Sequence, residues 1–382
     1  MELPSYFSDF LQDIRPTANQ KADAKTGHET LRKRLLSDDD LSPKIVTTFL
    51  QGSYRRATLI RPSSDCLADV DVVVVTTISE DLTPQKAMNL FVPFLEKYYK
   101  DKWEFQGRSI GIGLSDIELD LVITSAPSEA DRDALQSRSV TAEDTPEEAD
   151  DWRLVKSWVP TGERYMAGAA TRLELARKEA EWKLSPLRIP DRDAKEWKDT
   201  HPLEQMKWTW AKNRACKKHY VNVVKALKWW RRVNYEIPEY PKGYPLEHII
   251  GQSCPDEIAS VATGVTRTLE DIVTKYEADA RTEQTPTLLD HGVPQNVLHR
   301  LSGADFAEFY DQVCDAAVIA RRALDATTVH DSAIEWRKLF GDKFPPPPED
   351  DEDRHGGDDG AEKKAGYSPR EKPTIVGGGR YA

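Results

Sequence analysis

The sequence is poor in cysteine and contains no long uninterrupted hydrophobic segment. Its four cysteines, Cys66, Cys216, Cys254 and Cys314, are widely separated and form no Cys-x-x-Cys pair or Cys/His cluster with zinc-ligand spacing. This pattern argues against a zinc site and favours free thiols in a reducing compartment. The lack of a long apolar run argues against a membrane-spanning helix, and the start of the chain has neither the basic nor the apolar region of a leader.

The chain also lacks an excess of basic residues. It has 382 residues, of which 53 are Lys or Arg and 65 are Asp or Glu, so the net charge is −12. An acidic chain is unfavourable for non-specific nucleic-acid binding, although it is compatible with a local basic groove for triphosphates. We therefore predict a cytoplasmic protein that has no membrane partner and no nucleic-acid activator.

Two carboxylates at the start of a valine-rich segment are the most informative feature that is present. Asp69 and Asp71 open the run DVDVVVV, about sixteen residues after the dipeptide Gly52-Ser53. A run of β-branched residues favours a buried strand, and side chains alternate along a strand, so both acids are expected on one face. Two such carboxylates repel each other unless a divalent cation lies between them, and Mg2+ prefers oxygen ligands of this kind.

A third carboxylate is expected from a neighbouring strand. Acidic and apolar residues alternate strictly through the segment SDIELDLVI, which is typical of a strand. The alternation alone does not choose between Asp116, Glu118 and Asp120, and we favour Asp120 because it lies next to the apolar run. An isolated Asp-x-Asp is common on exposed strands. The order Gly-Ser, Asp-x-Asp and late acid favours a catalytic site over that alternative.

These residues resemble the polymerase-β-like nucleotidyltransferases, which combine a Gly-Ser motif, an Asp-x-Asp pair and a third Asp. More narrowly, QGSYRRATLIRP, DVDVVVV and ELDLVITSAP resemble the clade D branch of the bacterial cGAS/DncV-like nucleotidyltransferases of CBASS anti-phage systems. The resemblance covers nearly the whole chain, because it extends to FLEKYY, GRSIGIGLS, DWRLVKSW, THPLEQMKW, NVVKALKWWRR and YPKGYPLEHIIG.

The resemblance implies that Asp69, Asp71 and Asp120 are the catalytic carboxylates and hold two Mg2+ ions, with Mn2+ as an alternative. Three arginines near the Gly-Ser motif either contact phosphate or form ion pairs with the acidic site, and the sequence leaves both readings open. These are Arg55, Arg56 and Arg61.

The resemblance also implies nucleotide-binding roles for Gln51, Gly52 and Ser53. Glycine lets the backbone approach a phosphate, and the serine offers a hydroxyl and an N–H, although an isolated Ser would be read as a turn cap. Lys225 and Lys228 share one face of a predicted helix that resembles the triphosphate-binding helix of oligoadenylate synthetases. The alternative for both lysines is an ordinary solvated basic face.

The expected fold class is α+β, with a polymerase-β-like mixed sheet lobe followed by a helical lobe like that of oligoadenylate synthetases. Residues 1–200 are predicted to form the nucleotidyltransferase core, with two helices in 1–36 and one in 84–100. An irregular connection marked by Pro186, Pro190 and Pro202 leads to a helical lobe at 201–344. The proline-rich, acidic and glycine-rich tail at 345–382 is predicted to be disordered.

The activity that the resemblance implies is template-independent synthesis of a cyclic oligonucleotide from ATP and GTP, with 3′,3′,3′-cyclic AMP-AMP-GMP as the expected product. The product would activate an effector nuclease in a bacterial cytoplasm. An E1/E2-like protein is expected to conjugate the C-terminal residue, Ala382. The alternatives are a synthase of linear 2′–5′ oligoadenylate and a catalytically silent nucleotide-binding protein.

Overall fold

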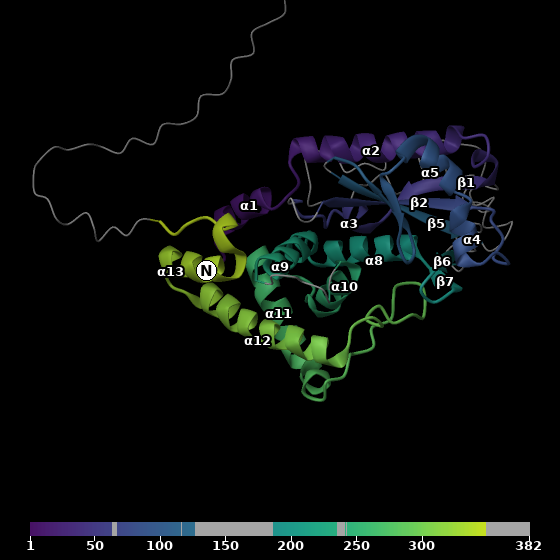
Figure 1. Cartoon of the computed structure of the whole chain (residues 1–382). Helices are drawn as coiled ribbons and strands as arrows, with labels where there is room; N and C mark the ends of the chain where they lie inside the picture. Colours follow the sequence, from purple (N-terminus) through teal and green to yellow (C-terminus); the bar gives the residue numbers. More distant parts are fainter. Residues whose placement is uncertain (63–66, 116, 127–185, 235–240, 242, 349–382) are drawn as a thin grey trace, which may run out of the picture. The chain divides into compact units, whose positions relative to one another are not determined.

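A computed structural model of the chain describes residues 1–62, 67–115, 117–126, 186–234, 241 and 243–348 (Figure 1). Met1–Pro347 form one compact unit. Asp116, most of the predicted disordered tail and its last residue, Ala382, lie outside the described residues.

In the described part of the chain, a mixed sheet of seven strands carries the two acidic segments. Its strand order is β1-β2-β5-β4-β3, with β6 pairing with β5 and β7 pairing with β6. β2 and β5 are parallel neighbours, and the other pairs are antiparallel. The strands are β1 (Ile45–Leu50), β2 (Ala68–Thr76), β3 (Trp103–Phe105), β4 (Ile110–Gly113), β5 (Ile117–Ser125), β6 (Leu187–Asp191) and β7 (Glu196–Thr200).

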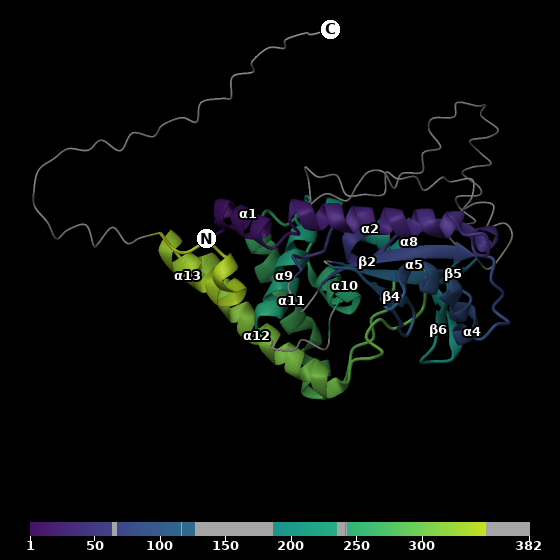
Figure 2. The same cartoon turned by 45° about the horizontal axis from the view of Figure 1, so that its top comes forward.

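Helices of the N-terminal half, except the first, pack into the core on one face of this sheet. The long helix α2 runs along the sheet, and its Leu31 and Leu35 are buried in the same core as Val70, Val72 and Val74 of β2 (Figure 2). A reciprocal capping box at its first turn fixes where α2 begins. The helices are α1 (Pro4–Asp13), α2 (Ala18–Ser37), α3 (Gly52–Arg55), α4 (Pro84–Asn89) and α5 (Val92–Tyr99).

The opposite face of β2 is turned toward the C-terminal half. Val73 and Val75 share a small core with Leu203, the second residue of α8. Because side chains alternate along a strand, Asp69 and Asp71 belong to this face. The helices of this half are α8 (Pro202–Ala215), α9 (Tyr220–Asn234), α10 (Gly243–Ser253), α11 (Val261–Arg281), α12 (Gly303–Asp325) and α13 (Val329–Phe340). Below, the sheet with α2–α5 is called the sheet lobe, and α1 with α8–α13 the helical lobe.

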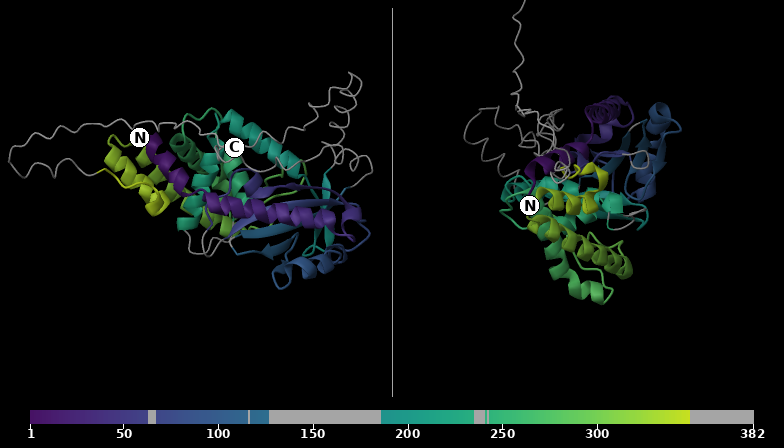
Figure 3. Two further views of the ribbon diagram at one scale, coloured as in Figure 1. Left: turned by 90° about the horizontal axis from the view of Figure 1, so that it is seen from above. Right: turned by 90° about the vertical axis from the view of Figure 1, so that its left-hand side faces the viewer.

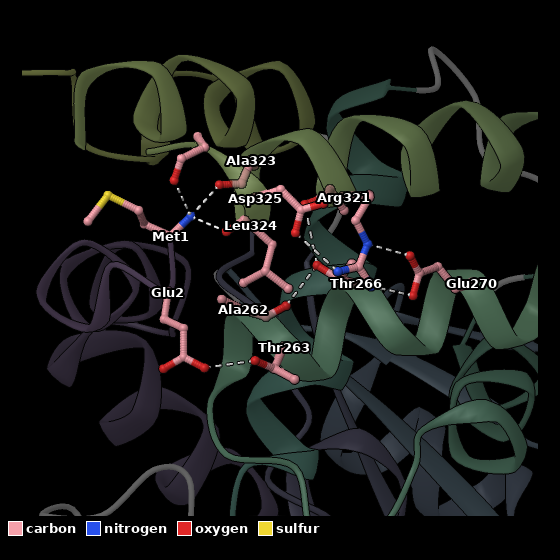
Figure 4. A network of polar contacts seen from close by, with 12 residues as sticks. Met1, Glu2, Ala262, Thr263, Thr266, Glu270, Arg321, Ala323, Leu324 and Asp325 are labelled. Carbon is pink, nitrogen blue, oxygen red and sulfur yellow. Dashed lines mark hydrogen bonds and ion pairs between the residues drawn. The ribbon is translucent and has the colours of Figure 1, made fainter. Parts of the chain in front are cut away.

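Helix α1 packs in the core of the helical lobe, although it precedes the sheet in sequence. Phe10 stacks on Phe340 of α13 with ring centroids 4.5 Å apart, and Phe7 meets Trp336 edge-on at 5.0 Å. Figure 3 shows α1 beside α13. The Met1 ammonium donates hydrogen bonds to main-chain carbonyls at the C-terminal end of α12 (Figure 4).

The α+β class and most predicted helices are confirmed, with two local corrections. The helix expected at 84–100 is divided into α4 and α5, and Pro93 lies in the first turn of α5. The irregular connection expected around Pro186 and Pro190 is wrong, because these residues lead into and belong to the β6–β7 hairpin. A proline is tolerated in a strand where its missing N–H costs no ladder bond. In the residues described, no helix has the length and apolarity required to cross a bilayer.

Candidate active site

The acids of β2 and β5 lie side by side on one face of the sheet. In the parallel register Asp71 is paired with Asp120, and Asp69 with Glu118. Register partners on adjacent strands point to the same face, so all four carboxylates are gathered there. We call Asp69, Asp71, Glu118 and Asp120 the acidic cluster. The expectation that Asp120 shares a face with the Asp-x-Asp pair agrees with this register, and Glu118 is an additional neighbour.

The carboxylates of the acidic cluster oppose one another electrostatically. Removal from bulk water, followed by repulsion from Asp71, raises the pKa of Asp69 to about 9 and that of Asp120 to about 7. Burial also raises the pKa of Asp71. The pKa values of the three aspartates are raised chiefly because burial disfavours a charged carboxylate, and repulsion between carboxylates adds to this for Asp69 and Asp120.

The cluster fits the needs of a divalent cation. Asp120 Oδ1 is buried and has no hydrogen-bond partner among the residues that the structure describes, so one carboxylate oxygen is left without the interaction that burial normally requires. Among the described residues, no three His, Cys, Asp or Glu side chains are close enough as they stand to hold a metal ion together. The donor set, which consists only of carboxylates, is nevertheless of the kind that Mg2+ and Mn2+ prefer.

The Gly-Ser segment lies directly against the acidic cluster. The Gln51 N–H donates to the Asp71 carbonyl at 3.0 Å, and the short helix α3 begins at the next residue. Gly52 has φ +71°, and a β-carbon built on it would lie 1.6 Å from Asp71 Oδ2. Ser53 accepts hydrogen bonds through its carbonyl from the Thr58 and Leu59 N–H groups at 2.9 and 3.1 Å, which close the turn after α3.

A buried ion-pair network connects this segment to the helical lobe. Glu247 of α10 accepts hydrogen bonds from Arg56 Nε at 3.1 Å, from Lys228 Nζ at 3.0 Å and from the Thr58 hydroxyl at 2.9 Å. Lys228 also donates to the Thr58 carbonyl at 3.1 Å. Arg56 lies over the ring of Tyr244, 5.0 Å from its centroid. The sequence analysis missed Glu247, because a single glutamate in an apolar helical segment carries no recognisable motif.

The other cationic side chains predicted near the site are buried or hydrogen-bonded to the main chain. Lys225 is 2% exposed, so the solvated basic face proposed as its alternative is not what the structure shows. Arg55 is also buried, at 1% exposure. Arg61 Nε donates to the Arg15 carbonyl at 2.9 Å and a second guanidinium nitrogen to that of Gln12, which ties the loop after α3 to α1.

A cavity of about 350 Å3 is lined by residues of both lobes. Arg108 lines it from the sheet lobe, and Tyr244 and Asp290 line it from the helical lobe. The same loop as Arg108 touches the cluster, because Gln106 Nε2 donates to Glu118 Oε1 at 3.3 Å.

Comparison with known proteins identifies the family. Residues 1–127 match the Second Messenger Oligonucleotide or Dinucleotide Synthetase domain. Over 381 residues the chain is 47% identical to the cyclic AMP-AMP-GMP synthase of Enterobacter hormaechei subsp. hoffmannii (strain UCI 50), covering 98% of this chain and 97% of that protein. The chain belongs to the bacterial cGAS/DncV-like nucleotidyltransferases (CD-NTases). This CD-NTase is also 48% identical over 353 residues to the probable cyclic AMP-AMP-GMP nucleotide synthase of Salmonella paratyphi B, covering 90% of this chain and 92% of that one.

Solved structures show the same fold. The CD-NTase CdnG of Bradyrhizobium diazoefficiens in complex with GTP superposes with a TM-score of 0.63 at 13% identity, covering 89% of this chain and 96% of that one. CdnC of E. coli MS115-1 with ATP gives 0.59 at 17% identity, covering 90% and 100%. The predicted family and nucleotidyltransferase activity are thus confirmed: this CD-NTase is a synthase of cyclic oligonucleotides.

Proposed function

We propose that the chain makes 3′,3′,3′-cyclic AMP-AMP-GMP from ATP and GTP without a template, as a second messenger of anti-phage defence. The observation that carries the product is the identity of 47% to a cyclic AMP-AMP-GMP synthase over almost the whole of both chains. At 27% identity, the chain is also related to the cyclic AMP-AMP-AMP synthase of Acinetobacter sp. (strain ATCC 27244 / 9458). The choice of guanine is therefore the point that experiment must decide.

Asp69, Asp71 and Asp120 are proposed as the catalytic residues, and they would hold the two Mg2+ or Mn2+ ions. When bound, such ions stabilise charge on phosphate oxygens and lower the pKa of an attacking hydroxyl. The contribution of the chain is to present the acids at adjacent register positions of β2 and β5. The central position in the sheet fixes their spacing, because both strands are paired on each side.

Gln51, Gly52, Ser53 and Lys228 are proposed to bind the donor triphosphate. Gln51–Ser53 open α3 beside Asp71, and the backbone N–H groups of a first helical turn favour anions. Lys228 is 12% exposed in its side chain and approaches the same segment from α9. Lys225, at 2% exposure, has less support from the structure, and its phosphate role stays a prediction.

The product is decided by incubating the purified chain with Mg2+ and all four nucleoside triphosphates, treating with phosphatase and measuring the mass of what remains. A cyclic trinucleotide with two adenines and one guanine is expected, resistant to phosphatase because it has no terminal phosphate. A phosphatase-sensitive 2′–5′ oligoadenylate would instead support the linear alternative. The absence of pyrophosphate release would support a silent nucleotide-binding protein.

Two partners extend the proposal: an effector nuclease activated by the product, and an E1/E2-like protein that conjugates Ala382. Both rest on the resemblance to CBASS systems. Co-expression with a candidate E1/E2 protein is expected to give a covalent adduct that is lost when Ala382 is deleted. An adduct that forms equally on the shortened chain would reject the C-terminus as the conjugation site.

A further inference from the structure

Glu247 is a buried carboxylate shared by two cations from different lobes. The side chains of Arg56 and Glu247 are each 5% exposed, and that of Lys228 is 12% exposed. Burial opposes ionisation of Glu247, but Arg56 and Lys228 outweigh it and lower its pKa to about 2. Glu247 is therefore an anion at neutral pH, and it satisfies two cations that would otherwise be buried without a counter-charge.

Each of these cations also borders the segment that lies against the acidic cluster. Arg56 directly follows α3, whose first residue lies against Asp71. Lys228 donates a hydrogen bond to the carbonyl of Thr58, in the turn that follows α3. In the part of the chain described, neither cation forms an ion pair with Asp69 or Asp71, and both pair with Glu247 instead.

We propose that Glu247 is a positioning residue that holds Arg56 and Lys228 away from the acidic cluster. The carboxylates of Asp69 and Asp71 then stay free to hold a divalent cation. The inference rests on the proposed function only where that function assigns these acids to the metal. Glu247 and Arg56 are 191 residues apart in sequence, and they meet where α10 packs near α3. The proposal explains why a carboxylate is buried at that point.

The competing account is purely structural. Arg56 and Thr58 belong to the sheet lobe, and Lys228 and Glu247 to the helical lobe, so the network also joins the lobes. If the network is only structural, replacing Glu247 lowers the stability of the fold, and replacing Arg56 as well lowers it further. If Glu247 is a positioning residue, replacing Arg56 as well removes the released cation and restores metal binding.

The test measures Mn2+ binding to the full chain without nucleotide. The electron paramagnetic resonance signal of free Mn2+ reports how much of the ion is bound. Glu247→Gln keeps the side-chain size and an acceptor oxygen but loses the charge. We expect its Kd for Mn2+ to rise about tenfold, the size of effect that one competing ion pair produces. In the double variant Glu247→Gln with Arg56→Gln, most of that loss should be recovered. Saturating Mg2+ should also restore turnover of Glu247→Gln.

Wild-type affinity in Glu247→Gln, or a double variant that binds no better than the single one, would overturn the proposal. So would an Asp71→Asn chain that binds Mn2+ as tightly as wild type, because the measured site would then lie elsewhere. If Glu247→Gln does not fold by circular dichroism, Glu247→Asp, which keeps the charge and shortens its reach, is judged by the same criterion. A wild-type chain that binds Mn2+ but makes no cyclic product rejects the proposed function and leaves this test standing.

Discussion

Gly52 and Asp71 are in such close contact that residue 52 has no room for a side chain. A β-carbon on Gly52 would lie 1.6 Å from Asp71 Oδ2 and 2.6 Å from Asp71 Cγ. The backbone at Gly52 also has φ +71°, a conformation that residues with a β-carbon rarely adopt. The glycine of the Gly-Ser motif therefore has a role before any phosphate arrives, since it lets α3 close over an acid of the candidate metal site.

Gly52→Ala is expected to lower kcat by about 100-fold, because either α3 or the Asp71 carboxylate must move by an ångström or more. The measurement is steady-state pyrophosphate release with ATP, GTP and Mg2+. Gly113→Ala on β4 is the matched control, because a β-carbon there would have only the Lys102 carbonyl nearby, at 3.8 Å. Near-normal kcat in Gly52→Ala would show that the contact with Asp71 does not limit catalysis.

The two lysines of α9 are separable by their exposure. Lys228→Met is expected to raise the KM for ATP about tenfold, because it removes one charged phosphate contact. Lys225→Met should leave that KM within about twofold, since Lys225 is 2% exposed and offers little surface to a ligand. Initial rates over a range of ATP concentrations at fixed GTP measure both. Similar increases in the two variants would place Lys225 on the phosphates as well.

Phe10 connects α1 to the helical lobe through its contact with Phe340. Phe10→Ala should lower the free energy of unfolding by about 3–5 kcal/mol, as expected for a buried phenylalanine. Urea denaturation followed by circular dichroism measures the change. Leu36→Ala on α2 is the control, because Leu36 is 54% exposed and should cost little. A loss below about 1 kcal/mol for Phe10→Ala would mean that α1 is not part of this core.

The alternation of acids and apolar residues was enough to predict that β2 and β5 each present their carboxylates on one face, because the strand period dictates it. The pairing of Asp69 with Glu118 was not predictable, since it depends on a register between strands about fifty residues apart. Glu247 was missed for a similar reason. Its role exists only once α10 packs near the segment after α3, and no local pattern encodes that contact.

Two other features depend on tertiary partners that are distant in sequence or not apparent from local composition. Phe7 and Phe10 gave a clear helical pattern, but the pattern does not say that α1 packs against α13, more than 300 residues later. The prolines near β6 suggested an irregular connection, whereas Pro190 pairs in register with Trp197. The local pattern does not show where α1 packs, or that Pro190 lies in a strand. Both depend on a partner segment that the local sequence does not reveal.

The acidic cluster should destabilise the fold when no divalent cation is present. The folded-state pKa of Asp120 is raised from 3.8 to about 7 by burial and by repulsion from its neighbours. Between these values the folded chain binds more protons than the unfolded chain, so the free energy of unfolding falls as pH rises from about 4 through about 7. Asp120→Asn removes this titration. In EDTA at pH 8 its Tm should exceed that of the wild type by a few degrees, and the difference should vanish near pH 4.

Scanning calorimetry across this pH range measures the effect, and metal provides its reversal. Added Mg2+ should raise the wild-type Tm at pH 8 and change the Tm of Asp120→Asn much less, because the variant lacks one of the proposed ligands. Asp193→Asn is the control, since the Asp193 side chain is 69% exposed and loses only a surface ion pair with Arg300, which should change the Tm little. A Tm of Asp120→Asn at or below that of the wild type at pH 8 in EDTA would contradict the argument. It would mean that the carboxylates are already compensated within the fold and do not need a cation to lie together.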